Sequence, residues 1–174
     1  MSEIAIRLVG AAGEMPVAGL TALLIDAVQG GASVGFLDGI TEAEATAYWN
    51  QVAASFGQYR LWVAVADGQV VGSVQIAPGT KANARYRAEV QKLLVHRDWR
   101  GRGLARRLME ACETHAQSMG LKLLFLDTEA GSPAEAIYRH LGWEKSGEIP
   151  LYFARPSGEL GTTAVYFKRL SGAP

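Results

Sequence analysis

The part of the chain that decides the fold joins a strand to a helix and reads Val95-His96-Arg97-Asp98-Trp99-Arg100-Gly101-Arg102-Gly103-Leu104-Ala105. The free N–H groups at a helix start, together with the positive end of the helix dipole, favour binding of an anion. Gly101 and Gly103 have no side chain that would keep an anion away from the backbone, and Arg100 and Arg102 add positive charge. The stretch therefore predicts a cradle for a phosphate group.

The positive charge of the chain is concentrated around this loop. The 174 residues carry seventeen Lys and Arg and seventeen Asp and Glu, so the formal net charge is zero. Residues 81–107 nevertheless carry a net charge of +7, against −5 for residues 1–80 and −2 for residues 108–174. Such a block indicates either a polyanion site or a solvated surface with ion pairs. Because the charge centres on a glycine loop rather than on a long face, we expect no nucleic-acid partner.

The hydrophobic pattern predicts one domain of mixed helices and strands. Its expected order is β-α-α-β-β-β-α-β-α-β-β, with no linker or repeat, over residues 1–174. Thr41 begins a capping box, and Asp67-Gly68 is typical of a hairpin turn. We interpret the run Leu121–Leu126 as a strand buried on both faces. The sequence therefore predicts a single α/β (α+β) domain.

Several classes of protein are disfavoured. No apolar stretch is long enough to span a membrane, and the N-terminus lacks the pattern of a secretory signal, so we expect a cytoplasmic protein without membrane contact. The lone cysteine, Cys112, excludes an internal disulfide. The three histidines do not lie at metal-ligand spacing, and we expect no metal. A Walker loop is absent, and Arg106 occupies the place of the third glycine of a dinucleotide-binding fingerprint.

Two motifs resemble those of the GNAT acyl-CoA N-acyltransferases. Arg100, Gly103 and Ala105 match the family's pyrophosphate-binding pattern R/Q-x-x-G-x-G/A. The segment Ala136–Trp143 resembles the family pattern A-x-x-x-Y-x-x-x-G-F/W through Tyr138, Gly142 and Trp143, and it follows the next strand, as in the family. The resemblance covers about residues 4–170. It implies a mixed, mostly antiparallel sheet of about six to seven strands with a splayed central pair, flanked by about four helices.

Less specific sequence patterns resemble one branch of this family. The N-terminal half of the tabtoxin-resistance acetyltransferase branch looks similar to Gly31–Leu37, Glu44-Ala45 and Tyr48-Trp49, and its last hairpin looks similar to Glu159–Thr163 and Tyr166–Lys168. That branch implies a small amine or an amino-acid-like molecule as the acceptor. The family resemblance also allows a homodimer, which the residues themselves do not indicate.

The resemblance implies roles for particular residues, with acetyl-CoA as the acyl donor and no metal. The expected donor-binding residues are Leu93, Leu94, Val95, Arg100, Gly101, Arg102, Gly103, Leu104, Ala105 and Tyr138. Glu89 and Asp127 end up at one cleft if the strands are placed as in the family, and either can take the proton of an amine. Tyr138 is the expected proton donor to the leaving thiolate. The structural alternatives are an ion pair of Glu89 with Arg85 or Arg87, a capping role for Asp127 and a core tyrosine.

These residues favour an N-acetyltransferase that moves the acetyl group directly to a small primary amine. The alternatives are a non-catalytic acyl-CoA-binding regulator and an acetyltransferase acting on protein or peptide amines. Glu89, Asp127 and Tyr138 together favour an enzyme over the regulator.

Overall fold

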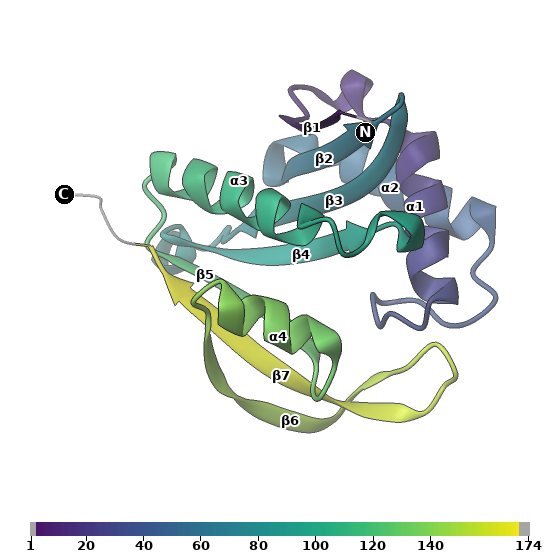
Figure 1. The fold of residues 1–174 in the computed structure, drawn as a ribbon. Coiled ribbons are helices and arrows are strands. Elements are labelled where there is room, and N and C mark those ends of the chain that lie inside the picture. The colour runs from purple at the N-terminus through teal and green to yellow at the C-terminus, as the bar shows by residue number, and fades with distance from the viewer. Residues whose placement is uncertain (1–2, 171–174) are drawn as a thin grey trace.

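The computed structural model describes residues 3–170, which form one sheet with helices on both of its faces (Figure 1). Within these residues there are seven strands and four α-helices in the expected order. They are β1 (Ile4–Leu8), α1 (Val17–Gln29), α2 (Glu42–Ala54), β2 (Arg60–Ala66), β3 (Gln69–Pro78), β4 (Arg87–Val95), α3 (Leu104–Ser118), β5 (Leu123–Glu129), α4 (Pro133–His140), β6 (Glu144–Ala154) and β7 (Leu160–Arg169).

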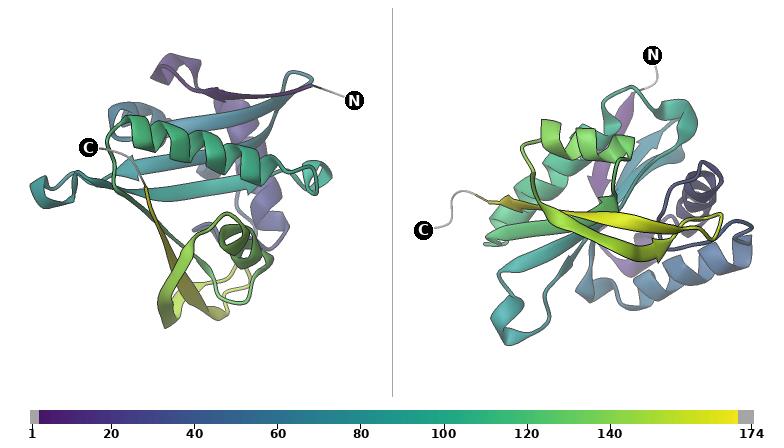
Figure 2. Two further views of the ribbon diagram at one scale, coloured as in Figure 1. Left: turned by 60° about the vertical axis from the view of Figure 1, so that its left-hand side comes forward. Right: turned by 90° about the horizontal axis from the view of Figure 1, so that it is seen from below.

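The strands follow the order β1-β2-β3-β4-β5-β7-β6, and only the β4–β5 pair is parallel. The helices α1 and α2 pack on one face, where Leu20, Leu24 and Trp49 are buried against β2. The helix α3 packs on the other face, and α4 lies beside it over β5 (Figure 2). This arrangement confirms the mixed, mostly antiparallel sheet flanked by four helices.

Two local predictions are confirmed in detail. The hydroxyl of Thr41 accepts the Glu44 N–H at 3.2 Å, and the Glu44 carboxylate accepts the Thr41 N–H at 2.8 Å, so the capping box begins α2. Asp67 and Gly68 both have positive φ, as the tight β2–β3 hairpin requires. These signals depend on neighbouring residues alone, which is why the sequence reports them well.

The central strands β4 and β5 are splayed, as expected. β4 pairs with β3 along most of its length, but it pairs with β5 only from Arg87 to Glu89 (Figure 1). Between Gln91 and Leu94 β4 has one residue more than β3, and Lys92 within this bulge has a φ of +52°. Beyond Glu89, the side of β4 that faces β5 therefore has no partner strand.

The bulge reverses the direction in which β4 side chains point. Before it, Ala88 and Val90 pack into the core under α3. After it, Leu94 packs under α1 and α2 instead, although an even spacing would keep it on the same face as Val90. The one extra residue thus exchanges the two faces of the strand at the point where the strands separate.

The interpretation of Leu121–Leu126 as a strand buried on both faces is wrong. Lys122 interrupts the run, and β5 begins only at Leu123. Leu124 and Leu126 are buried, but Phe125 is only half-buried and is covered by the Arg87 guanidinium, 5.6 Å from the ring centre. No described helix covers this face of β5, because α1 and α2 pack on the half of the sheet formed by β2 to β4.

Candidate active site

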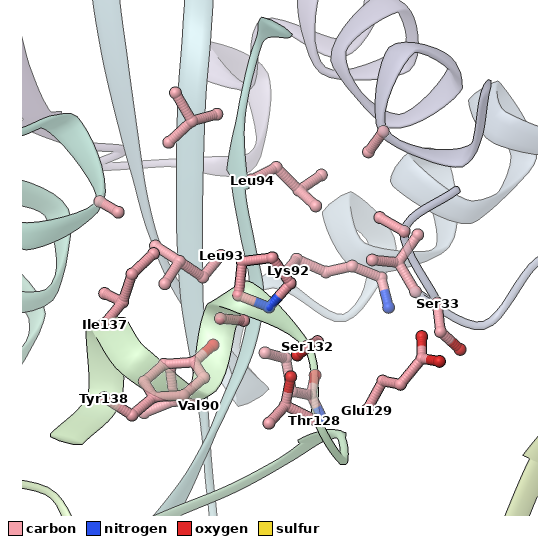
Figure 3. Close-up of a pocket in the computed structure, with 18 of the residues that line it drawn as sticks. Ser33, Val90, Lys92, Leu93, Leu94, Thr128, Glu129, Ser132, Ile137 and Tyr138 are labelled. Carbon is pink, nitrogen blue, oxygen red and sulfur yellow. The ribbon is translucent and has the colours of Figure 1, made fainter. Parts of the chain in front are cut away.

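A cleft of about 1350 Å³ lies where β4 and β5 separate (Figure 3). Its walls come from the segment after α1, from β4, from the loop before α3, from the end of β5 and from α4. The expected site residues that line it are Glu89, Leu93, Leu94, Val95, Arg100, Gly101, Gly103, Leu104, Ala105, Asp127 and Tyr138. Arg102 is the expected site residue that does not line it.

The loop before α3 presents free backbone donors to the cleft. The first hydrogen bond of the helix runs from the Arg107 N–H to the Gly103 oxygen at 3.1 Å. No hydrogen-bond acceptor within residues 3–170 is found for the N–H groups of residues 101–106. Gly101 and Gly103 both have a φ of +73°, which L-residues rarely adopt. The glycines are therefore needed for the path of the backbone that leads these free donors into the helix.

The arginines around this loop have different partners. Arg97 forms an ion pair with Asp26 on α1, and Arg106 forms one with Glu110 at 2.7 Å. The guanidinium of Arg102 lies 4.5 Å from the centre of the Trp99 ring, outside the cleft. Arg100 lines the cleft, and its Nε donates to the Val95 oxygen at 3.3 Å. Carboxylates thus neutralise two of these arginines, Arg97 and Arg106, and the backbone donors with Arg100 form the cradle.

The two expected acids lie on the two strands that separate at the cleft, Glu89 on β4 and Asp127 on β5. Glu89 is half-buried on β4 and has no ion pair or hydrogen bond within the described residues, so an ion pair with Arg85 or Arg87 is not formed. Asp127 on β5 accepts a hydrogen bond from the Thr163 hydroxyl at 3.1 Å and caps no helix. Both carboxylates therefore remain able to accept a proton from a molecule in the cleft.

Tyr138 lies on α4 and is 7% exposed. Its ring packs near Trp143 and Tyr166, and its hydroxyl points into the cleft (Figure 3). Burial raises the pKa of Tyr138, and the negative charge of Asp127 adds to this effect. The phenol therefore holds its proton at neutral pH and can donate it.

The sequence did not single out Lys92, which also lines the cleft. Its ammonium lies 5.0 Å from the centre of the Tyr48 ring, on α2. Tyr48 is held in turn by the buried Gln75, whose amide donates to the Tyr48 hydroxyl at 3.1 Å and to Gln91 at 2.9 Å. Ser132, at the start of α4, was also missed, and its buried hydroxyl has no hydrogen-bond partner in the described structure.

Two loops meet at one end of the cleft. The segment after α1 contributes Ser33 and Val34 to the wall, and β6 contributes Phe153. The Asp38 N–H donates to the Pro156 oxygen at 2.8 Å and so joins the α1–α2 loop to the β6–β7 hairpin. Arg155 ties the same hairpin to Glu129 at 2.6 Å. These contacts bound the cleft at this end.

The other titratable groups of the sequence do not form a second reactive centre. Cys112 is fully buried on α3, and burial raises its pKa to about 12, so its thiol is unreactive at neutral pH. No group of three or more potential metal ligands occurs among the residues that the structure describes. No helix in this part of the chain is long and apolar enough to cross a membrane.

Comparison with known proteins gives consistent results. Residues 23–143 match the model of the acetyltransferase (GNAT) family. The chain is 39% identical over 84 residues to the uncharacterized N-acetyltransferase YjgM of Escherichia coli, a match that covers 48% of this chain and 50% of YjgM. It is 28% identical over 120 residues to an L-methionine sulfoximine/L-methionine sulfone acetyltransferase of Pseudomonas aeruginosa, covering 60% of this chain and 69% of that protein.

A solved structure of similar fold is that of yncA from Salmonella typhimurium with its cofactor acetyl-CoA. The TM-score is 0.79 at 19% sequence identity, and the alignment covers 99% of this chain and 97% of that one.

Proposed function

The chain belongs to the GNAT family of acetyltransferases, and on that premise we propose that it transfers an acetyl group from acetyl-CoA to the primary amine of a small amino-acid-like molecule. The observation that carries the proposal is the meeting of an anion cradle, two available carboxylates and a buried tyrosine hydroxyl at one cleft. The name of the Pseudomonas aeruginosa relative, which acts on amino-acid derivatives, supports the choice of acceptor class.

The donor end of the cleft fits a pyrophosphate. The N–H groups of residues 101–106 are free of protein acceptors at the start of α3, and Arg100 provides a positive charge at the cleft beside them. The unpaired side of β4 beyond Glu89 provides the backbone that an extended pantetheine arm can follow, with Leu93, Leu94 and Val95 on the cleft wall. Acetyl-CoA bound in this way supplies an acetyl thioester near the bulge.

The acceptor end provides the proton transfers that acyl transfer requires. An alkylamine is protonated at neutral pH, so Glu89 or Asp127 removes a proton directly or through water before a carbon–nitrogen bond can form. As the carbon–sulfur bond breaks, the Tyr138 hydroxyl gives its proton to the departing thiolate. Backbone N–H groups on the free side of β4 stabilise the negative charge that develops on the acetyl oxygen.

The walls of the acceptor end favour a small molecule over a protein or peptide acceptor. The α1–α2 loop and the β6–β7 hairpin are joined by the hydrogen bond from Asp38 to Pro156. A peptide crossing this end would have to separate the two loops. The free carboxylate of Glu89 also favours an enzyme over a binding regulator, because an unpaired acid in a cleft serves no purpose in holding a pyrophosphate.

The test is release of the CoA thiol from acetyl-CoA with a panel of small amines and amino acids. We expect turnover with at least one amino-acid-like amine. We expect Tyr138→Phe to lower kcat about 100-fold or more while the dissociation constant for acetyl-CoA stays unchanged. Tight binding of acetyl-CoA without turnover on any amine would favour the binding regulator, and an equal loss of kcat and donor binding would reject the role of Tyr138.

The proposal includes a cytoplasmic location, which the single unpaired cysteine supports. It also includes a homodimer. The edge strand β6 exposes Ile149, Leu151 and Tyr152, with 71% of Leu151 accessible, and an exposed apolar strand edge is suited to pairing with a second copy. Sedimentation equilibrium measures the mass of the species in solution.

A further inference from the structure

Lys92 has an unusual conformation and an ammonium group without a polar partner. Its φ of +52° is uncommon for a residue other than glycine, and such conformations cluster at functional sites. The Ser73 hydroxyl holds the Lys92 carbonyl at 2.9 Å, which keeps the bulge in place. The ammonium can donate three hydrogen bonds, but no acceptor for it is found among residues 3–170, and it lies over the Tyr48 ring, 5.0 Å from the ring centre.

The charges around this ammonium make the acceptor end dipolar. The negative charges of Glu89 and Asp127 attract the Lys92 ammonium at a distance, although neither carboxylate comes within ion-pair distance of it. The charge of Glu129 is compensated by Arg155 at 2.6 Å. The Lys92 side chain extends toward Ser33 and Glu129 (Figure 3). The Lys92 ammonium therefore faces the cleft without an ion-pair partner, and Glu89 and Asp127 are the carboxylates whose charges act on it.

We propose that Lys92 binds an anionic group of the acceptor, in the first instance the carboxylate of an α-amino acid, while Glu89 and Asp127 receive its amine. This inference rests on the proposed function, because it assigns the acceptor its position in the same cleft. A zwitterionic amino acid has a negative group for Lys92 and a positive group for the two carboxylates, whereas a simple amine leaves the Lys92 ammonium without a partner. Burial lowers the pKa of Lys92, and an anion beside the ammonium would offset the cost of burying its charge.

The experiment compares free acids with their amides. L-Methionine sulfone and the standard L-α-amino acids are each paired with the corresponding α-carboxamide, which keeps the amine and removes the negative charge. Binding to the protein saturated with CoA is measured by calorimetry, and thiol release from acetyl-CoA is measured in parallel. For the preferred acceptor we expect the free acid to bind more tightly than its amide. Lys92→Met should weaken the free acid about 10- to 100-fold and the amide much less.

The matched control is Lys81→Met. Lys81 is exposed, caps no helix through its side chain and lies outside the cleft. The substitution therefore removes the same charge without affecting the acceptor site. Lys92→Arg, which keeps the charge, should retain more of the preference for the free acid than Lys92→Met. Circular dichroism and the acetyl-CoA dissociation constant report whether Lys92→Met remains folded.

Three outcomes decide the matter. Loss of the acid-over-amide preference in Lys92→Met alone supports the proposal. Equal affinity of the wild type for acids and amides, or an equal effect of Lys92→Met on both, overturns it. An intact preference in binding without thiol release from any pair would instead refute the proposed acetyl transfer and leave the assignment of Lys92 standing.

Discussion

Glu135 holds the start of the helix that carries Tyr138, and its replacement by Gln is expected to destabilise the fold in a pH-dependent way. Glu135 is 3% exposed in the first turn of α4. Its carboxylate accepts hydrogen bonds from the Tyr166 hydroxyl on β7, from the Gly131 N–H at 2.6 Å and from the Lys145 ammonium at 3.0 Å. One side chain thereby joins α4 to two strands.

The magnitude follows from the pKa of this carboxyl. The hydrogen bond from Tyr166 is the largest influence, and with those from Gly131 and Lys145 it lowers the pKa of Glu135 from 4.5 to about 2, against the opposing effect of burial. Because one pKa unit corresponds to about 1.4 kcal/mol, ionisation of Glu135 contributes about 3 kcal/mol to the free energy of unfolding at pH 7. The contribution is fully present above pH 4.5, falls to less than half at pH 3, and is lost below pH 2.

The assay is urea unfolding of the wild type and Glu135→Gln at several pH values between 7 and 3. We expect the variant to be about 2 to 3 kcal/mol less stable at pH 7 and the difference to shrink as the pH falls. Glu148→Gln is the control, because exposed Glu148 also contacts Lys145, at 2.5 Å, and should cost less than about 1 kcal/mol. Equal stability of wild type and Glu135→Gln at pH 7, or a difference that does not change with pH, would refute the reasoning.

Three further predictions concern the cleft and the core. Gly103→Ala should weaken acetyl-CoA binding about tenfold, since an L-residue at a φ of +73° costs about 1–2 kcal/mol, whereas Gly13→Ala should leave the calorimetric dissociation constant unchanged. Arg155→Met, which removes the ion pair with Glu129, should raise the acceptor KM several-fold without altering donor affinity. Cys112 should react with a thiol reagent only after unfolding. Modification of the folded protein at the same rate as the unfolded chain would contradict the burial of Cys112.

The features that the sequence predicted well are those set by neighbouring residues. The capping box at Thr41 and the Asp67-Gly68 turn each depend on a few adjacent positions. The element order followed from these signals together with hydrophobic spacing. The prediction that both faces of β5 are buried failed, because the exposure of Phe125 depends on which half of the sheet α1 and α2 cover. That choice is made by contacts between distant segments.

The interaction partners of the basic residues could not be predicted for the same reason. Counting charges located the basic block, but the ion pair of Arg97 joins residues 71 positions apart, and Arg107 donates to the Ile4 oxygen across 103 positions. Neither partner can be read from local spacing. The count therefore could not tell which arginine serves the cradle; Arg100 is the one that lines the cleft without a carboxylate partner in the described structure.

The position of Lys92 shows why one residue at the site escaped prediction. In a regular strand Lys92 would point to the same face as Val90, into the core under α3. The bulge changes this direction, because its extra residue takes the left-handed conformation and the alternation resumes in the opposite sense at Leu94. A bulge depends on the register with β3 rather than on the residues of β4 alone. The same backbone irregularity thus separates β4 from β5 and brings an ammonium to the cleft, so the donor path and the charge at the acceptor end have one structural cause.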